Sequence, residues 1–271
     1  MSNQFKQNFL QTPIQTSTNG RRMDKLNFET LAADHTTRLG LIVLQSDVTI
    51  EDEFRYFLEG LPVNLLVNRI PFENEVTVET LRKMQSHLTK SMSLFPIDAE
   101  FDSMGYGCTS GALHIGDKHI AELVSSTRPC KSITNPMQAA IEAMRHIGAK
   151  RIAYLAPYSK EVSQTMVDMF EENSIEVPVA CTFDEKQDMI VGRIAPSSIQ
   201  QACLELCAKE KVDAVFVACT NMKCAHIIPE IERQTGIVAT SSNQALAWHM
   251  TKLAGLNNQI NNKGRLFECK A

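Results

Sequence analysis

The amino-acid sequence predicts an α/β protein in which two pseudo-symmetric domains, each with a parallel sheet, form an active site in the cleft between them. Three observations support this fold class. Short apolar runs recur along the chain, helical patterns separate them, and a Cys-Thr pair occurs at matching places in the two halves. Apolar runs without alternation are typical of strands buried on both faces, and strands that alternate with helices are typical of βαβ units.

The predicted strands begin at Leu39–Leu44, a run of sequence LGLIVL that contains no polar side chain. The apolar runs that follow are also short and consist largely of aliphatic residues. The predicted strands are 39–44, 63–67, 101–107, 151–155, 214–218 and 237–240.

The predicted helices fill the intervals between these strands. The clearest has Thr134 or Asn135 available as N-cap, Pro136 in its first turn and Gly148 after its end. Such residues mark helix boundaries, because they satisfy or tolerate the unpaired backbone groups there. The predicted helices are 76–92, 112–124, 136–147, 197–208, 224–234 and 244–253.

The strand and helix pattern runs twice, over 39–124 and again over 151–234. This duplication at a spacing of about 110 residues fits the usual size of a compact domain. We expect an N-terminal extension at 1–37, a first domain at 38–133 plus 241–258, and a second domain at 134–240. The extension shows no clean periodicity, and its role stays open.

Composition excludes several classes of protein. The net charge of −4 and the lack of a basic block argue against nucleic acid or a membrane surface as partner. The N-terminus lacks the apolar core of a signal peptide, and no apolar run reaches the length of a membrane span. We therefore expect a cytoplasmic protein whose eight cysteines are reduced.

The sequence predicts no metal and no cofactor. No C-x-x-C spacing or H-x-x-x-H pair suggests a metal site, and neither a G-x-G-x-x-G nor a P-loop motif is present. His114 and His226 each follow a Cys-Thr turn and could lie near a thiolate, but we expect them to be surface or core residues.

Two cysteines occupy positions where chemistry is expected. Cys108 and Cys219 each follow a predicted strand and precede a helix, at the carboxyl end of a parallel sheet where ligands bind. The N–H groups and dipole of a helix start stabilise a thiolate. Beside the two cysteines, hydroxyl and amide groups could hold a carboxylate or an enediolate formed from it; these neighbours are Thr109, Ser110, Thr220 and Asn221. Thiols on opposite faces of one carbon form a two-base device, in which one removes a proton and the other delivers one.

The sequence resembles the aspartate/glutamate racemase superfamily, in the branch of maleate cis–trans isomerases, arylmalonate decarboxylases and racemase-like proteins of ectoine utilisation. The resemblance covers nearly all of residues 38–256. The segments that carry it are 40–49 (GLIVLQSDVT), 107–111 (GCTSG), 156–158 (APY), 218–221 (ACTN) and 241–245 (SSNQA).

The resemblance implies two flavodoxin-like (Rossmann-like) domains with an exchanged last helix, and an interdomain site without a cofactor. Cys108 and Cys219 match the two catalytic cysteines of the superfamily. Thr109, Ser110 and Tyr158 match positions that bind the substrate carboxylate. Having both cysteines argues against the decarboxylase, which keeps only the second.

Two positions depart from the maleate isomerases, which carry asparagine where this chain has Asp47 and, by a less secure alignment, Asp188. An ionised aspartate only accepts hydrogen bonds and repels a carboxylate, so Asp47 favours a substrate with an ammonium or amide N–H. The ectoine-utilisation branch resembles this chain in having aspartate there. Asp47 is alternatively a cap or turn residue, and Ser46 beside it is a further candidate for substrate binding.

The leading functional hypothesis is a cofactor-independent racemase or epimerase of an amino acid or N-acylated amino acid, in which Cys108 and Cys219 exchange protons. One alternative is a maleate cis–trans isomerase with Cys108 as nucleophile and Cys219 as proton donor. Others are a cofactor-free decarboxylase and a non-catalytic metabolite-binding protein. All of these predict a small-molecule carboxylate as partner, and we expect a homo-oligomer.

Overall fold

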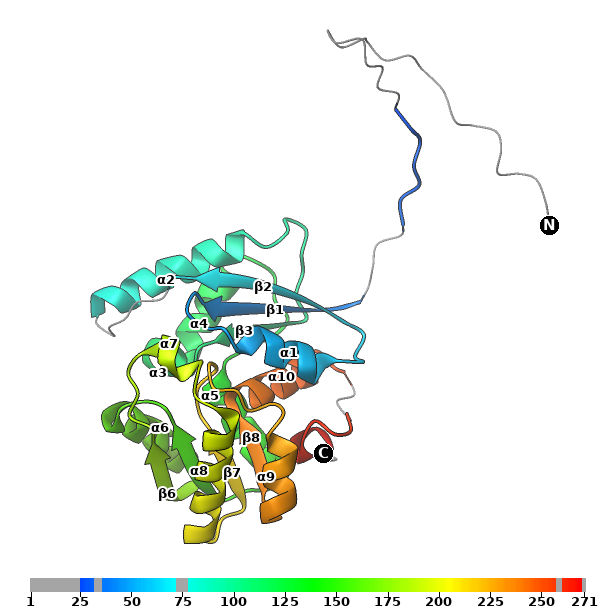
Figure 1. Ribbon diagram of the computed structural model, residues 1–271. Coiled ribbons are helices and arrows are strands. Elements are labelled where there is room, and N and C mark those ends of the chain that lie inside the picture. The colour runs from blue at the N-terminus through cyan, green and yellow to red at the C-terminus, as the bar shows by residue number, and fades with distance from the viewer. Residues whose placement is uncertain (1–24, 32–35, 72–77, 257–259, 270–271) are drawn as a thin grey trace, which may run out of the picture. The chain divides into compact units, whose positions relative to one another are not determined.

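The computed structural model describes residues 25–31, 36–71, 78–256 and 260–269 (Figure 1). The chain divides into two units, Met1–His35 and Thr36–Ala271. Residues 25–31 of the first unit contain no helix or strand, and the rest of the described chain belongs to the second unit. No helix among the described residues is long and apolar enough to cross a membrane.

The first sheet has four parallel strands in the order β2-β1-β3-β4. Its strands are β1 (Thr37–Leu44), β2 (Val63–Ile70), β3 (Ser103–Gly107) and β4 (Ile133–Thr134). Strand β1 is central and almost wholly buried, as its unbroken apolar sequence predicts.

The second sheet repeats the arrangement of the first, with four parallel strands in the order β6-β5-β7-β8. Its strands are β5 (Arg151–Ala156), β6 (Glu176–Thr182), β7 (Ala214–Val217) and β8 (Val238–Ser241). The predicted fold class, with two similar parallel-sheet halves, is therefore confirmed.

Helices connect successive strands along the chain. They are α1 (Ile50–Leu58), α2 (Val78–Ser93), α3 (Thr109–Ile115), α4 (Asp117–Ser125), α5 (Pro136–Ile147), α6 (Lys160–Glu172), α7 (Asp188–Val191), α8 (Pro196–Lys209), α9 (Ile228–Thr235) and α10 (Ser242–Leu253), with a short 3₁₀ turn at Arg265–Phe267. Helix α5 links the first sheet to the second. Helix α10 follows the last strand of the second sheet but packs on α5, α1 and β3 (Figure 1). The predicted domain boundaries themselves stay a prediction.

The structure corrects two predicted helices. The segment 112–124 is broken at Gly116, whose φ of 84° ends α3 and begins α4. Such a φ is easy only for glycine, so the helical pattern on both sides cannot run through it. The helix predicted at 224–234 begins at Ile228, with Pro229 in its first turn.

Several helices and strands of the structure were not predicted from the sequence. Strand β4 has only two residues, and the edge strand β6 is interrupted by Pro178 and is only half-buried. Neither contains an unbroken apolar run. Helices α1, α6 and α7 were also not predicted, although α1 is strongly amphipathic over its nine residues.

Buried polar groups join α1 to the second half of the chain. Glu53 on α1 accepts hydrogen bonds from the backbone N–H groups of Cys224 (2.5 Å) and Ala225 (2.7 Å) and from the side-chain amide of Asn243 (2.9 Å). Burial raises the pKa of Glu53 to about 7, against the opposing effect of these donors. The carboxyl group thus fixes α1 against the turn that follows Cys219.

Candidate active site

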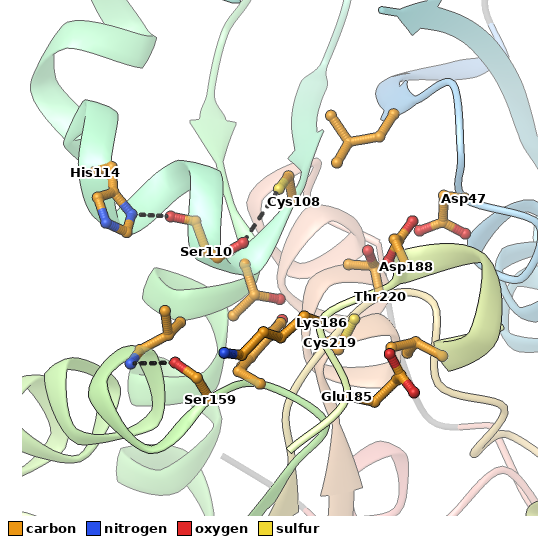
Figure 2. A pocket seen from close by; sticks show the side chains of 15 residues that line it. Asp47, Cys108, Ser110, His114, Ser159, Glu185, Lys186, Asp188, Cys219 and Thr220 are labelled. Atoms are coloured by element: carbon orange, nitrogen blue, oxygen red, sulfur yellow. Dashed lines mark hydrogen bonds between the residues drawn. The ribbon is translucent and has the colours of Figure 1, made fainter. Parts of the chain in front are cut away.

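A cavity of about 350 Å³ lies at the carboxyl ends of strands from both sheets (Figure 2). It is lined by Leu44, Asp47, Cys108, Thr109, Ser110, His114, Tyr158, Ser159, Val162, Glu185, Lys186, Asp188, Val191, Cys219 and Thr220. The structure therefore brings both predicted cysteines to one cavity, together with six of the eight other predicted site residues. This is where open α/β sheets bind ligands.

Cys108 is the N-cap of α3, directly after β3. Its sulfur accepts a hydrogen bond from the Gly111 N–H at 3.2 Å and lies 3.9 Å from the Ser110 hydroxyl (Figure 2). The thiol is 6% exposed. A sulfur in the capping position receives the partial positive charge of the helix start, which favours its thiolate form.

Cys219 follows β7 in an unusual backbone conformation, with a φ of 89°. A residue with a side chain rarely adopts this conformation, and such strain is typical of functional turns. The Cys219 sulfur accepts a hydrogen bond from the Asn221 N–H at 3.4 Å. Both sulfurs thus have a backbone donor from the residues that follow them.

Ser242 links the two cysteine turns. Its Oγ lies at the start of α10, accepts the Cys219 N–H at 3.1 Å and accepts the Thr109 hydroxyl at 3.1 Å. Ser242 is fully buried. One hydroxyl therefore sets the positions of the turns after β3 and β7 relative to each other, a role that the sequence did not reveal.

Replacing Ser242 with alanine should destabilise the protein by about 1–3 kcal/mol, because it leaves the buried Cys219 N–H without an acceptor. Isomerase or racemase turnover should fall with it, since both cysteine turns lose their common contact. Urea unfolding followed by circular dichroism measures the first effect. Ser103→Ala is the matched control, because Ser103 is fully buried and its hydroxyl has no hydrogen bond among the described residues. Equal stability of the two variants would contradict the role of Ser242.

Burial raises the pKa of both thiols. The pKa of Cys108 is raised to about 11, against the lowering effects of the Gly111 N–H and the Ser110 hydroxyl. The pKa of Cys219 is raised further, by burial and by the nearby Asp188 carboxylate. Cys108 is consequently the thiol that ionises first, and Cys219 is the one that keeps its proton.

Hydroxyl groups surround the two sulfurs. The Tyr158 hydroxyl lowers the pKa of Cys219, and burial beside that thiol raises the pKa of Tyr158 well above its usual value. Tyr158 therefore stays protonated and able to donate a hydrogen bond. The Ser110 hydroxyl has the same capacity beside Cys108. The Thr109 hydroxyl is engaged with Ser242.

Asp47 and Asp188 lie together on one side of the cavity (Figure 2). Asp47 caps α1, because its Oδ1 accepts the N–H groups of Thr49 (2.8 Å) and Ile50 (2.9 Å). The capping alternative raised by the sequence thus holds for this oxygen. Burial raises the pKa of Asp47, and the nearby Asp188 carboxylate adds to this.

Ser46 and Asn221 are buried beside the cavity but do not line it. The side chain of Asn221 accepts the Val48 N–H at 3.0 Å and donates to the Asp188 carbonyl and carboxylate at 3.0 and 3.1 Å. Its amide group is thus occupied by protein partners. This geometry favours a positioning role for Asn221, which joins the loop after β1 to α7.

The cavity also contains residues that the sequence did not predict. Leu44, Val162 and Val191 form apolar lining, while Ser159, Glu185 and Lys186 add polar groups. His114 is exposed, as expected of a surface histidine, and it also lines the cavity, where its Nδ1 lies 2.8 Å from the Ser110 carbonyl oxygen. All eight cysteines are free. The described residues contain no cluster of three or more metal-binding side chains.

Comparisons with known proteins place the chain among enzymes. A sequence profile of the family described as arylmalonate decarboxylase matches residues 109–267. The chain is 24% identical to a maleate isomerase of Geobacillus stearothermophilus over 246 residues, which cover 86% of this chain and 98% of that protein. It is 25% identical to the arylmalonate decarboxylase of Bordetella bronchiseptica over 201 residues, which cover 72% and 78% of the two chains.

A solved structure has the same fold. A cysteine-to-serine mutant of the Nocardia farcinica maleate cis–trans isomerase, with a covalently bound succinylcysteine intermediate, superposes with a TM-score of 0.77 at 22% identity. The alignment covers 87% of this chain and 99% of that one. The predicted superfamily branch is therefore confirmed, and so is the prediction of an enzyme of isomerase type.

Proposed function

The chain belongs to the arylmalonate decarboxylase family, and on that premise we propose that it is a cofactor-independent cis–trans isomerase of a small unsaturated carboxylic acid, with Cys108 as nucleophile and Cys219 as proton donor. Maleate isomerases among the relatives support this reaction over the racemase that the sequence favoured. The cytoplasmic location and the homo-oligomer stay predictions.

The observation that carries the proposal is the unequal pair of thiols in one cavity. Cys108 has the lower pKa, and its sulfur caps a helix start. Cys219, with the higher pKa, suits a group that stays protonated until it delivers a proton. A symmetrical two-base racemase would need thiols that exchange these roles easily. The difference between the two environments thus favours a fixed nucleophile and a fixed acid.

In the proposed reaction the Cys108 thiolate adds to one alkene carbon of the cis acid. A C–S bond forms, and the electron pair of the double bond moves to the other alkene carbon as an enediolate. The Cys219 thiol protonates that carbon, which leaves a single bond about which the substrate can rotate. The Cys219 thiolate then removes a proton, the trans double bond forms, and the Cys108 thiolate leaves.

Hydroxyl donors support the charged intermediate. Ser110 lies beside the Cys108 sulfur and Tyr158 beside Cys219, so each can donate to a carboxylate whose charge grows as the enediolate forms. Leu44, Val162 and Val191 form apolar parts of the cavity wall, and hydrogen bonds beside them are stronger where these side chains exclude water.

The racemase is kept as a second candidate because two thiols from similar turns line one cavity. It predicts a different outcome in heavy water: deuterium at the α-carbon of an amino acid, with loss of optical activity. A decarboxylase would release carbon dioxide from a malonate. These products separate the candidates directly.

The test is incubation of the purified full chain with maleate and with maleamate, its monoamide, followed by proton NMR. Appearance of the trans isomer of either compound, and no racemisation of a panel of amino acids, is the expected result. Racemisation without any cis–trans conversion would replace the isomerase with the racemase.

A further inference from the structure

One buried carboxylate oxygen in the cavity has no hydrogen bond of good geometry among the described residues, although the Thr220 hydroxyl lies close enough to its carboxyl group to lower the pKa. It is Oδ2 of Asp47, a residue that is only 2% exposed. A buried polar atom without a partner is costly, and at a ligand cavity it marks a place where the ligand supplies the partner. The oxygen is ready to accept a hydrogen bond from a bound molecule.

The local backbone fixes the direction of this oxygen. Because Oδ1 accepts the Thr49 and Ile50 N–H groups at the start of α1, the carboxyl group cannot turn without breaking both hydrogen bonds. Those donors lower the pKa of Asp47 and so oppose the burial that raises it. The neighbouring Asp188 is held on the same side by the Asn221 amide.

The cavity is therefore divided by charge. Two carboxylates, Asp47 and Asp188, gather on one side of the sulfurs, and Figure 2 shows Ser110 and His114 on the other side. A substrate carboxylate finds a hydroxyl donor at Ser110, but a second carboxylate near Asp47 would meet like charge beside a side chain that is only 2% exposed.

We infer that Asp47 selects a substrate whose second end is a hydrogen-bond donor, a primary amide or an ammonium group, and rejects a dicarboxylate. This inference rests on the proposed isomerase function and names its substrate class: a cis-unsaturated acid with one carboxylate and one N–H-bearing group. The N–H group donates to Asp47 Oδ2, and the carboxylate lies with the hydroxyl donors. Maleamate has this chemistry, and maleate is the matched dicarboxylate.

The test compares kcat/KM for maleamate and maleate in the wild type and in Asp47→Asn. Asparagine is isosteric, and its oxygen can still accept the Thr49 and Ile50 N–H groups, so the cap of α1 is retained. Its NH₂ then points to where Oδ2 lay and donates to an acceptor. The wild type should prefer maleamate, and the substitution should shift the ratio toward maleate by about 100-fold.

Asp52→Asn is the control, because it removes the same charge from an exposed position on α1 that does not line this cavity. It should leave the ratio unchanged. A wild type that converts maleate as well as maleamate, with an unchanged ratio in Asp47→Asn, would overturn the inference and leave the isomerase function standing.

A binding measurement tests the selectivity of Asp47 independently of the proposed isomerase activity. In a Cys108→Ala background neither ligand reacts, so calorimetry reports affinity alone. Tighter binding of maleamate than maleate, reversed when Asp47→Asn is added, supports the inference even if the wild type isomerises neither compound. Equal affinities in both backgrounds, or no binding of either ligand, would overturn it.

Discussion

Cys108→Ala should lose cis–trans isomerisation entirely, whereas Cys219→Ala should lose turnover but accumulate a covalent adduct on Cys108. Each loss should amount to at least about 10³-fold in kcat, the range typical of removing a nucleophile or a positioned acid. The asymmetry follows from the proposed roles, because only Cys108 forms a bond to carbon.

The adduct should persist for a chemical reason. Without Cys219, water can slowly protonate the enediolate on the Cys108 thioether, which gives a saturated product. Reversal needs a base at the Cys219 position to remove a proton from carbon, and alanine cannot supply one. Intact-protein mass spectrometry should therefore show one added substrate molecule on Cys219→Ala and none on Cys108→Ala.

Cys207→Ala is the control for loss of a thiol as such, since Cys207 is half-buried on α8 and does not line the cavity. It should keep wild-type turnover. If both active-site variants lost activity without any adduct, and the wild type exchanged deuterium into an amino acid, the fixed-nucleophile mechanism would fail and the two-base racemase would take its place.

The sequence predicted the parts of the site that depend on local pattern. Cys108 and Cys219 could be found because each follows an apolar strand and precedes a helix, and a strand-to-helix turn in a parallel sheet always lies at the ligand-binding edge. The same logic predicted both sheets. It failed at β6, because a half-buried edge strand has a weaker hydrophobic pattern. It also missed α6, although that helix buries Met166, Val167 and Phe170 on one face.

The remaining site residues depend on long-range packing. Ser242 contacts Thr109 and Cys219, which lie 133 and 23 positions away in the chain. Lys186 and Glu185 reach the cavity from the connection between β6 and α7. No spacing rule links such residues to the cysteines, so only the fold reveals them. The sequence left open whether Asp47 binds substrate or serves as a cap or turn residue. Its Oδ1 accepts backbone N–H groups at the start of α1, and its Oδ2 is the oxygen that we propose accepts a hydrogen bond from the substrate.

The pH dependence of kcat/KM should report the Cys108 thiol. Since the pKa of Cys108 is about 11, only a small fraction is thiolate at neutral pH, and this fraction grows about tenfold per pH unit below the pKa. Between about pH 8 and pH 10, kcat/KM should therefore rise about tenfold per unit. Cys219 keeps its proton over this range because its pKa lies above that of Cys108.

The enzyme must stay folded over the pH range in which this slope is measured. The pKa of Glu53 is raised to about 7 in the folded protein, so its protonated form favours folding. That contribution is complete at low pH and is lost as pH rises through about 7, after which it no longer changes. Above about pH 8 the Glu53 titration is thus finished. The buried thiols with raised pKa values then lower the stability as pH rises through their ordinary pKa of 9.0, so melting temperatures recorded at each pH define the usable range. A kcat/KM that is flat above neutral pH would mean that Cys108 is already ionised in the free enzyme, and the proposed order of the two thiols would then be wrong.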